Sequence, residues 1–294
     1  MIRPGEIWRD REGRPINLRS GGVIEHDGTW WWFGVHDGGG AVEHGIRACS
    51  STDLMVWADH GIVLSAAEIP GGKVGAPKVV RCPRTGGLIL WFHLPEAMTV
   101  GVAFASLPGK PFSFLHALRH HGGISPGMTL FVDDDGSIWH VFRRDGHEAF
   151  FICRLDETGL HHTGELIRID NGGFHQGPAL MKWDGCYWLL ASDGVDGLPS
   201  EARLSVAPSL RGPWEMAGSP CVGSAAQVES CFNARPSWIL RVPGPPAHFV
   251  LVADGAPCDD EAVRHVWLPF DFRHGVPELR WQEAWSPARW SGCG

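Results

Sequence analysis

The stretch QGPALMKWDGCYWLLASDG, residues 176–194, has the pattern of two β-strands joined by a tight turn. Two runs rich in apolar residues flank Asp184-Gly185, and an Asp-Gly pair between such runs is a strong local signal for a β-hairpin. The first run begins with Gln176 and the second ends with Asp193. An antiparallel hairpin brings its two open ends together, so the stretch predicts a strand pair with polar groups at that end.

The same arrangement of strand, turn and aromatic strand occurs five times along the chain. The other four copies are SGGVIEHDGTWWWFGVHDG (20–38), GAPKVVRCPRTGGLILWFHLPE (75–96), GMTLFVDDDGSIWHVFRRDG (127–146) and ARPSWILRVPGPPAHFVLVADG (234–255). Each copy is followed by a second hairpin, which gives a repeat of roughly 50–60 residues and about four strands, the size of a propeller blade. Apolar and polar residues alternate in several strands, and no segment shows a sustained helical stripe.

We therefore predict an all-β fold, a five-bladed β-propeller with four antiparallel strands per blade. We expect one domain over residues 1–294, with blades at roughly 16–65, 74–122, 125–170, 174–222 and 231–285. The first strand of each blade is innermost in such a fold, so its leading residues face a central cavity, where ligands bind. The polar ends of the second strands are expected at the same cavity, and they are His36, His93, Arg143, Asp193 and Asp254.

Composition narrows the possible partners. The 294 residues carry a net charge of −8 without a Lys/Arg cluster, which argues against nucleic acid and membrane surfaces as partners. The chain starts without an apolar secretion signal, and no run approaches the ~20 apolar residues of a membrane span, so we expect a cytoplasmic protein. The 8 cysteines show no zinc spacing and are expected to be free thiols. We expect no metal and no cofactor.

The blades resemble those of glycoside hydrolase family 43, in particular the branch that contains exo-β-1,3-galactanases. The resemblance extends from about Arg11 to Trp285 and rests on segments such as GGVIEHDGTWWWFG, CSSTDLMVW, MTLFVDDDG and GPALMKWDGCYWLLASDG. It implies the five-bladed fold. It also implies a site at the heads of the inner strands, where members of the family carry the carboxylates that cleave glycosidic bonds.

At these strand heads the chain departs from the family's pattern. The family's Glu-Arg-Pro-Lys in the second blade is Gly75-Ala76-Pro77-Lys78 here, and its Ser-Arg-Asp-Met in the third is Ser125-Pro126-Gly127-Met128. Its Glu-Ala-Pro in the fourth blade, where the Glu is the general acid, is Gln176-Gly177-Pro178. Phe-Asn-Ser-Gln of the galactanase branch is Phe232-Asn233-Ala234-Arg235, and the usual Ala-His of the first blade is Leu18-Arg19-Ser20. Asp254 matches a family Asp.

The substitutions change the chemistry expected of the cavity. Inverting hydrolysis needs a carboxylic acid for the leaving oxygen and a second group that activates water, roughly 6.5–9.5 Å apart. Gln176 donates hydrogen bonds but not a proton, and the guanidinium of Arg235 stays charged and accepts none. We therefore predict a repurposed propeller enzyme that acts on a small molecule, anionic or partly apolar, by cyclisation, isomerisation or elimination in a cationic and aromatic pocket.

The candidate site residues follow from the strand ends. We expect catalytic roles for His93, His175, Arg235 and Gln176, since His is the common general acid or base and Arg binds anions. Contacts to the substrate are expected from Arg19, Lys78, Thr129, Arg143, Asp193, Asp254, His36, Trp32 and Trp267.

Two alternatives remain open. The first is an inverting exo-glycosidase similar to the β-1,3-galactanases, with relocated acids drawn from Glu43, Glu68, Glu96, Glu201 and Glu229. The second is a catalytically inactive propeller that binds carbohydrate.

Overall fold

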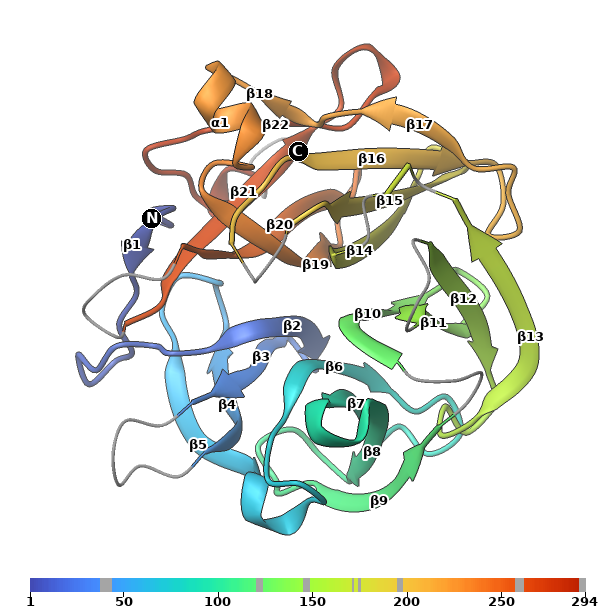
Figure 1. Cartoon of the computed structure of the whole chain (residues 1–294). Coiled ribbons are helices and arrows are strands. Elements are labelled where there is room, and N and C mark those ends of the chain that lie inside the picture. Colours follow the sequence, from blue (N-terminus) through green and yellow to red (C-terminus); the bar gives the residue numbers. More distant parts are fainter. Residues whose placement is uncertain are drawn as a thin grey trace.

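The structure, a computed structural model, consists of five sheets arranged around a central axis (Figure 1). It describes residues 1–37, 44–119, 124–144, 149–170, 172–173, 176–194, 198–256 and 262–290, and the side chains of all of these except residues 124–126 and 289. The predicted five-bladed β-propeller with four antiparallel strands per blade is confirmed.

Each of the first four sheets is a meander of four consecutive strands. The first contains β2 (Arg19–His26), β3 (Thr29–His36), β4 (Gly45–Ser51) and β5 (Ala58–Ser65). The second contains β6 (Gly75–Arg81), β7 (Leu88–Leu94), β8 (Thr99–Ala105) and β9 (Ser113–Leu118). The third contains β10 (Ile124–Val132), β11 (Ile138–Arg144), β12 (Phe150–Leu155) and β13 (His162–Ile169), and the fourth β14 (Gln176–Trp183), β15 (Cys186–Ser192), β16 (Ala202–Ala207) and β17 (Glu215–Gly218).

The fifth sheet closes the ring. Its antiparallel strands are β19 (Ala234–Val242), β20 (His248–Gly255), β21 (Arg264–Asp271) and β22 (Glu278–Arg280). Two short strands join it, β18 (Cys221–Val222) in parallel to β22 and β1 (Glu6–Ile7) in antiparallel to β21. The predicted fourth blade included residues 221–222, which the structure assigns to the fifth sheet, because a two-residue strand has no alternation from which its partner can be read.

Helices are short. They are η1 (Ala66–Glu68), η2 (Pro95–Ala97), α1 (Ala225–Glu229), η3 (Arg273–Gly275) and η4 (Pro287–Trp290). None of the helices in the described part of the chain has the length and apolar character that crossing a bilayer requires.

The core lies between neighbouring sheets. Trp32 of β3 and Trp267 of β21 are both buried where the fifth blade meets the first, with ring centroids 5.0 Å apart in an edge-to-face arrangement. Trp57 packs edge-to-face against both. Edge-to-face pairs stabilise beyond the area that they bury. Trp32 and Trp267, predicted as walls of the ligand pocket, therefore belong to the core that closes the ring.

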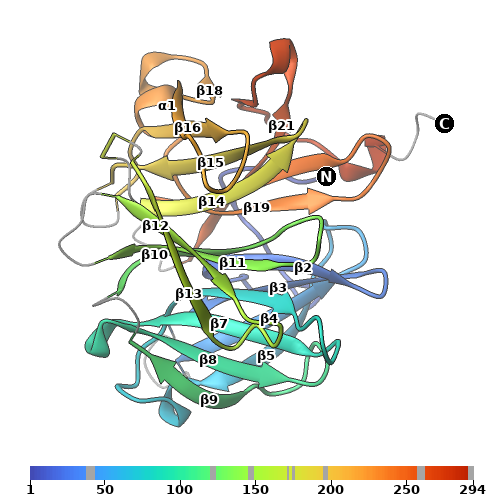
Figure 2. The same cartoon turned by 90° about the vertical axis from the view of Figure 1, so that its right-hand side faces the viewer.

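The inner strands β2, β6, β10, β14 and β19 contact one another in a closed ring, and β14 and β19 lie side by side in Figure 2. Three of these strands begin with a bulge at a residue of positive φ: Ser20 (53°), Ala76 (44°) and Gly177 (54°). A bulge leaves one residue unpaired and re-aims its neighbours, and such strain is typical of functional sites. The bulges thus separate the strand heads from the regular ladder below them.

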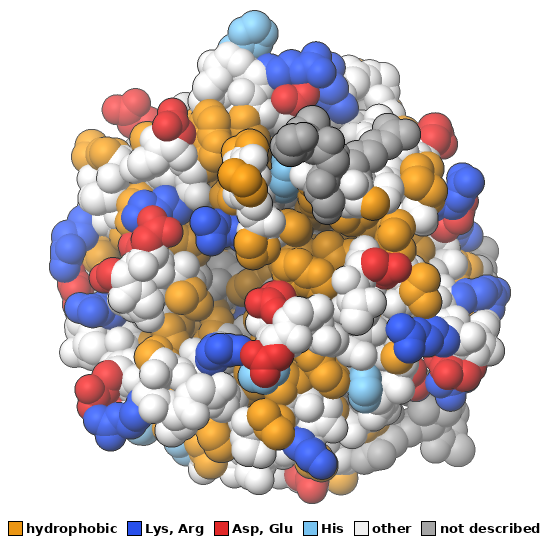
Figure 3. All heavy atoms as spheres, turned by 180° about the vertical axis from the view of Figure 1, so that it is seen from behind, with side chains coloured by type: hydrophobic (Ala, Val, Ile, Leu, Met, Phe, Trp, Pro, Cys, Tyr) orange, Lys and Arg blue, Asp and Glu red, His pale blue; other side chains and the backbone are white. Residues whose placement is uncertain are grey.

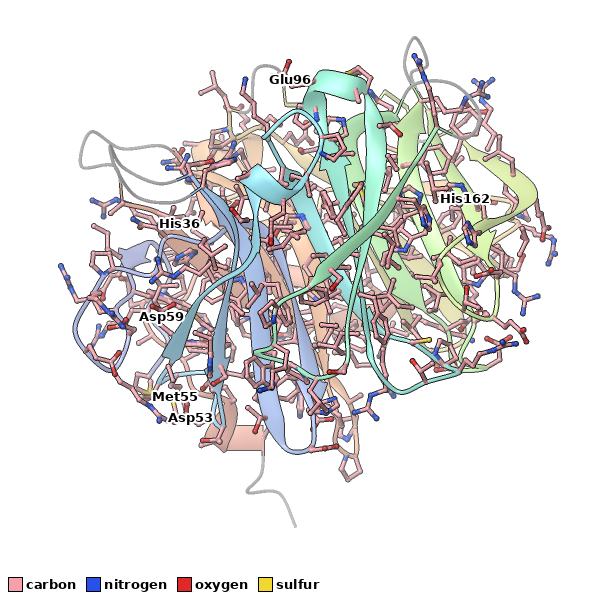
Figure 4. All side chains as sticks on the ribbon, turned by 90° about the horizontal axis from the view of Figure 1, so that it is seen from below. His36, Asp53, Met55, Asp59, Glu96 and His162 are labelled. Carbon is pink, nitrogen blue, oxygen red and sulfur yellow. The ribbon has the colours of Figure 1, made fainter. Side chains whose placement is uncertain are left out.

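A buried histidine pair lies within the third blade. Nδ1 of His140 in β11 is 3.0 Å from Nε2 of His162 in β13, the residue labelled in Figure 4. The ring of His140 stacks on Phe142 at 4.7 Å. Burial first, and then the neighbouring His162, hold the pKa of His140 well below its usual value. The folded protein therefore keeps His140 neutral where the unfolded chain takes up a proton.

This pair predicts a pH-dependent stability. The unfolded chain binds the extra proton as the pH falls below the ordinary histidine pKa of about 6.5, so the free energy of unfolding decreases by up to about 1.4 kcal/mol per pH unit for each such histidine. His140→Phe is expected to reduce the number of protons taken up on unfolding by about one. Urea titrations between pH 8 and 5 measure this as a smaller decrease of the free energy of unfolding with falling pH. His161→Phe, at an exposed position, is the matched control. An unchanged slope in His140→Phe would contradict the prediction.

Candidate active site

The heads of the inner strands surround a cavity of about 340 Å³ on the propeller axis. This volume lies in the range of small-molecule sites. The residues that line it are Ser20, Ala76, Lys78, Gly127, Met128, Gln176, Gly177, Pro178, Ser192, Gly194, Leu198, Arg235, Pro236, Ser237 and Asp254. We call this cavity the head pocket. His36 and Glu96 lie toward the same end of the molecule, whereas Asp53 and Met55 lie at the other end (Figure 4).

A second cavity of about 520 Å³ lies at the opposite end of the axis, between the far ends of the same strands. Hydrophobic side chains surround a hollow at the centre of that face (Figure 3). The two cavities are separated at Gly22, where an added Cβ would stand 3.3 Å from the ring of Trp238 and 3.5 Å from the side chain of Lys78. Lys78 lines the head pocket and Trp238 lines the second cavity, so the two side chains near Gly22 belong to different cavities.

Lys78 ties the first two blades together. Its Nζ, on a fully buried side chain, donates to the carbonyl oxygens of Ser20 (2.6 Å), Gly21 (3.2 Å) and Pro77 (3.3 Å). Burial lowers the pKa of Lys78 to about 7, against the opposing effect of Asp254. The three carbonyl groups satisfy the three N–H donors of the ammonium group. Lys78 therefore lines the pocket with its Nζ committed to the backbone, where it holds the heads of β2 and β6 together.

Asp254 is the one carboxylate among the described residues that line the head pocket. It lies near the end of β20, is 3% exposed, and its Oδ2 accepts the backbone N–H of Ser20 at 2.6 Å. The positive φ of Ser20 belongs to the bulge that begins β2. The strained head of the first blade thus positions a carboxylate supplied by the fifth.

Gln176 and Arg235 lie on neighbouring strand heads. At Gly177 an added Cβ would come within 2.4 Å of the carbonyl oxygen of Pro236, so only glycine allows β14 to approach β19 this closely. Arg235 is in turn the register partner of Asp254 across β19 and β20. Gln176, Arg235 and Asp254 therefore follow one another along one side of the pocket, and both Gln176 and Arg235 are half-buried.

The structure thus brings together four of the predicted site residues, namely Gln176, Arg235, Lys78 and Asp254, and places others elsewhere. Thr129 is fully buried within β10 and is not among the lining residues. His93 is buried opposite Gly75 in the second blade. His36 is buried with its Nδ1 3.3 Å from the carbonyl oxygen of Asn17. His175 lies outside the described residues.

The remaining charged candidates also lie outside the lining. Arg19 pairs with Asp37 at 3.5 Å, and Arg143 is half-buried near the end of β11. Asp193 is exposed. The residue before it, Ser192, is the register partner of Gln176 and lines the pocket in its place. Sequence reasoning missed Ser192 and Ser237. The signal for Ser192 was its place one residue before the expected polar end, because side chains alternate between the two faces of a strand.

The glutamates considered as relocated acids do not reach the pocket where the structure describes them. Glu96 pairs with Lys73 at 2.8 Å and Glu201 with Arg203 at 3.1 Å. Glu68 caps its own 3-10 helix, and Glu229 is exposed on α1. Glu43 lies outside the described residues. Among the described residues no three His, Cys, Asp or Glu side chains gather as a metal site.

The sequence profile of glycosyl hydrolases family 43 matches residues 22–235. The chain belongs to this family. The match begins within β2, includes β6, β10 and β14 and ends at the head of β19, so it covers most of the lining residues but not Ser20 or Asp254. The predicted resemblance is confirmed at the level of family and fold.

Solved structures of the family superpose over almost the whole chain. A family 43 β-1,3-galactosidase with galactodeoxynojirimycin is 30% identical, with a TM-score of 0.89 over 97% of this chain and 100% of that one. Another family 43 β-1,3-galactosidase is 25% identical, with a TM-score of 0.89 over 99% of this chain and 64% of that one. A β-D-galactofuranosidase of Aspergillus niger is 26% identical over 229 residues, 69% of this chain and 66% of that protein. The chain thus spans just under two thirds of two of these relatives.

These relatives overturn the prediction of a cyclase, isomerase or lyase, because they are named as glycoside hydrolases. The idea of an inactive, pseudo-glycosidase propeller finds no support in them either. The prediction gave too much weight to the residues at the heads of the inner strands, such as Gln176 and Arg235. The carboxylate of the pocket comes from β20, the second strand of the fifth blade, and its approach depends on how the ring closes.

Proposed function

We propose that this protein is an inverting exo-glycosidase that releases a terminal galactosyl residue from β-galactosides. The observation that carries the proposal is the match, at 30% identity over 97% of this chain and 100% of the other, to a β-1,3-galactosidase solved with galactodeoxynojirimycin. The A. niger relative is by its name a β-D-galactofuranosidase, an enzyme for the furanose form of the same sugar. The ligand class supported by both is a sugar.

The head pocket suggests roles for its residues. Asp254 acts as general base and takes a proton from the attacking water, since its Oδ2 is fixed by Ser20 and a carboxylate is an effective proton acceptor. Gln176 and Arg235 donate hydrogen bonds on the side of the leaving group. Met128 and Pro178 add apolar contacts, so the bound glycoside combines a strongly hydrogen-bonding part with a less polar face.

The test is turnover of the purified full-length chain on a panel of 4-nitrophenyl glycosides. We expect the β-D-galactopyranoside to be hydrolysed at least about tenfold faster than the β-D-xyloside and the α-L-arabinofuranoside, a difference that needs about 1.4 kcal/mol of transition-state binding. Proton NMR of the first product should show the α anomer of galactose, as inversion requires. Calorimetric binding of galactodeoxynojirimycin without hydrolysis of any galactoside would overturn the proposal.

A further inference from the structure

We propose that the leaving group departs from the head pocket as an unprotonated oxyanion, and that it is the phosphate of a galactosyl phosphodiester held by Gln176 and Arg235. This inference rests on the proposed function and specifies the substrate class of the same site. It arises from the kind of hydrogen-bonding groups that the fourth and fifth blades present.

The two hydrogen-bond donors, Gln176 and Arg235, lie on strand heads that pack against each other. The contact between Gly177 and the carbonyl group of Pro236 brings the head of β14 against the head of β19, and Gln176 and Arg235 both line the pocket there. A carboxamide N–H and a guanidinium N–H stabilise negative charge by hydrogen bonding but keep their protons. Such a pair suits a group that leaves as an anion.

The acidity of the leaving group then decides the rate. An alcohol leaves readily only when an acid protonates it, and general acid catalysis contributes on the order of 10²–10⁴-fold. A phosphate monoester dianion is the conjugate base of an acid with a pKa of about 6, so it needs no such help. Guanidinium groups also bind phosphate oxygens in pairs with well-defined geometry. Arg235 therefore favours phosphate over other acidic leaving groups.

The charged groups that the proposed reaction uses are Arg235 and Asp254. Arg235 lies next to Gln176 of the fourth blade and is the register partner of Asp254 on β20, so the donors and the carboxylate are neighbours in the pocket wall. Asp254 faces the side that the first blade supplies through Ser20. In this proposal the attacking water lies at Asp254 and the phosphate at Gln176 and Arg235.

The reaction balances without a further reagent. Asp254 takes one proton from water while the water oxygen forms a bond to the anomeric carbon. The bond between that carbon and the bridging oxygen breaks, and its electron pair stays on the phosphate, which leaves as a monoester dianion. The proton on Asp254 then passes to solvent, and galactose is released.

The experiment compares leaving groups on one sugar. The substrates are methyl β-D-galactoside, aryl β-D-galactosides with phenols of increasing acidity, and phenyl β-D-galactosyl phosphate. We expect kcat/KM to rise steeply with the acidity of the phenol. The kcat/KM of the phosphodiester should be about 10- to 100-fold higher than that of an aryl galactoside whose leaving group has the same pKa. This factor is the contribution expected of charge-assisted hydrogen bonds to the phosphate.

A variant pair isolates the contribution of Arg235. Arg235→Met is expected to reduce the rate ratio of phosphodiester to matched aryl galactoside by about tenfold or more. Arg241→Met, near the far end of the same strand and exposed, should leave that ratio unchanged. A steep dependence on leaving-group acidity with no preference for the phosphodiester would overturn the assignment of phosphate. A flat dependence would overturn the whole inference while leaving the glycosidase standing, whereas no hydrolysis of any substrate would overturn the proposed function itself.

Discussion

Replacing Gln176 with Glu is expected to accelerate the hydrolysis of methyl β-D-galactoside and of β-1,3-galactobiose by about 10²–10⁴-fold. These substrates have poor leaving groups, whose departure requires a proton. Gln176 lies at the head of β14 on the proposed leaving-group side, and Glu has the same length and nearly the same shape. The substitution therefore adds a proton donor at a place where the native amide offers only a hydrogen bond.

The pH dependence distinguishes this effect from a change in packing. An introduced general acid works only while it is protonated, so activity of Gln176→Glu should fall as the pH rises through the pKa of the new carboxyl. The native protein should lack this alkaline decrease on the same substrates. Gln282→Glu, at a half-buried position outside the pocket, is the matched control. It should show neither the gain in activity nor the new decrease at alkaline pH. No gain in Gln176→Glu, with activated galactosides still hydrolysed, would show that Gln176 does not face the leaving group.

Replacing Asp254 with Asn is expected to reduce kcat by about 10²–10⁴-fold on every substrate of the native protein. Asparagine keeps the oxygen that accepts the N–H of Ser20 and nearly the same volume, but it does not take a proton from water. The loss should therefore appear in kcat for both activated and unactivated galactosides, because the attacking water is common to both.

Stability measurements check that the loss is chemical. The urea midpoint of Asp254→Asn should stay close to that of the native protein, since the hydrogen bond that crosses from the fifth blade to the first is retained. Asp193→Asn is the matched control, because Asp193 follows the second strand of the fourth blade but is exposed. Activity of Asp254→Asn within threefold of the native protein would remove Asp254 from the mechanism.

The sequence pattern within each hairpin was sufficient to predict the fold. Asp-Gly turns, alternating strands and a repeat of four strands predicted five blades, because each hairpin is specified by its own residues. The same reasoning placed Gln176 and Arg235 at the pocket, since both stand at the head of an inner strand. It failed for Trp32 on a second strand and Trp267 on a third strand, because the face of a strand that meets the next blade cannot be told from the face that meets ligand when both are apolar.

The sequence by itself determined the blades and the positions of the inner strand heads, with the amide of Gln176 at the head of the fourth blade, since these depend on residues close together in the chain. The sequence placed both Asp193 and Asp254 at the expected cavity, but only the tertiary structure decided that Asp254 lines the pocket and accepts the N–H of Ser20, 234 positions earlier in the chain. Closing the ring joins the fifth blade to the first, and the bulge at Ser20 turns its N–H toward that carboxylate. Contacts of this kind depend on where distant strands end relative to one another, which alternation and turn chemistry do not specify.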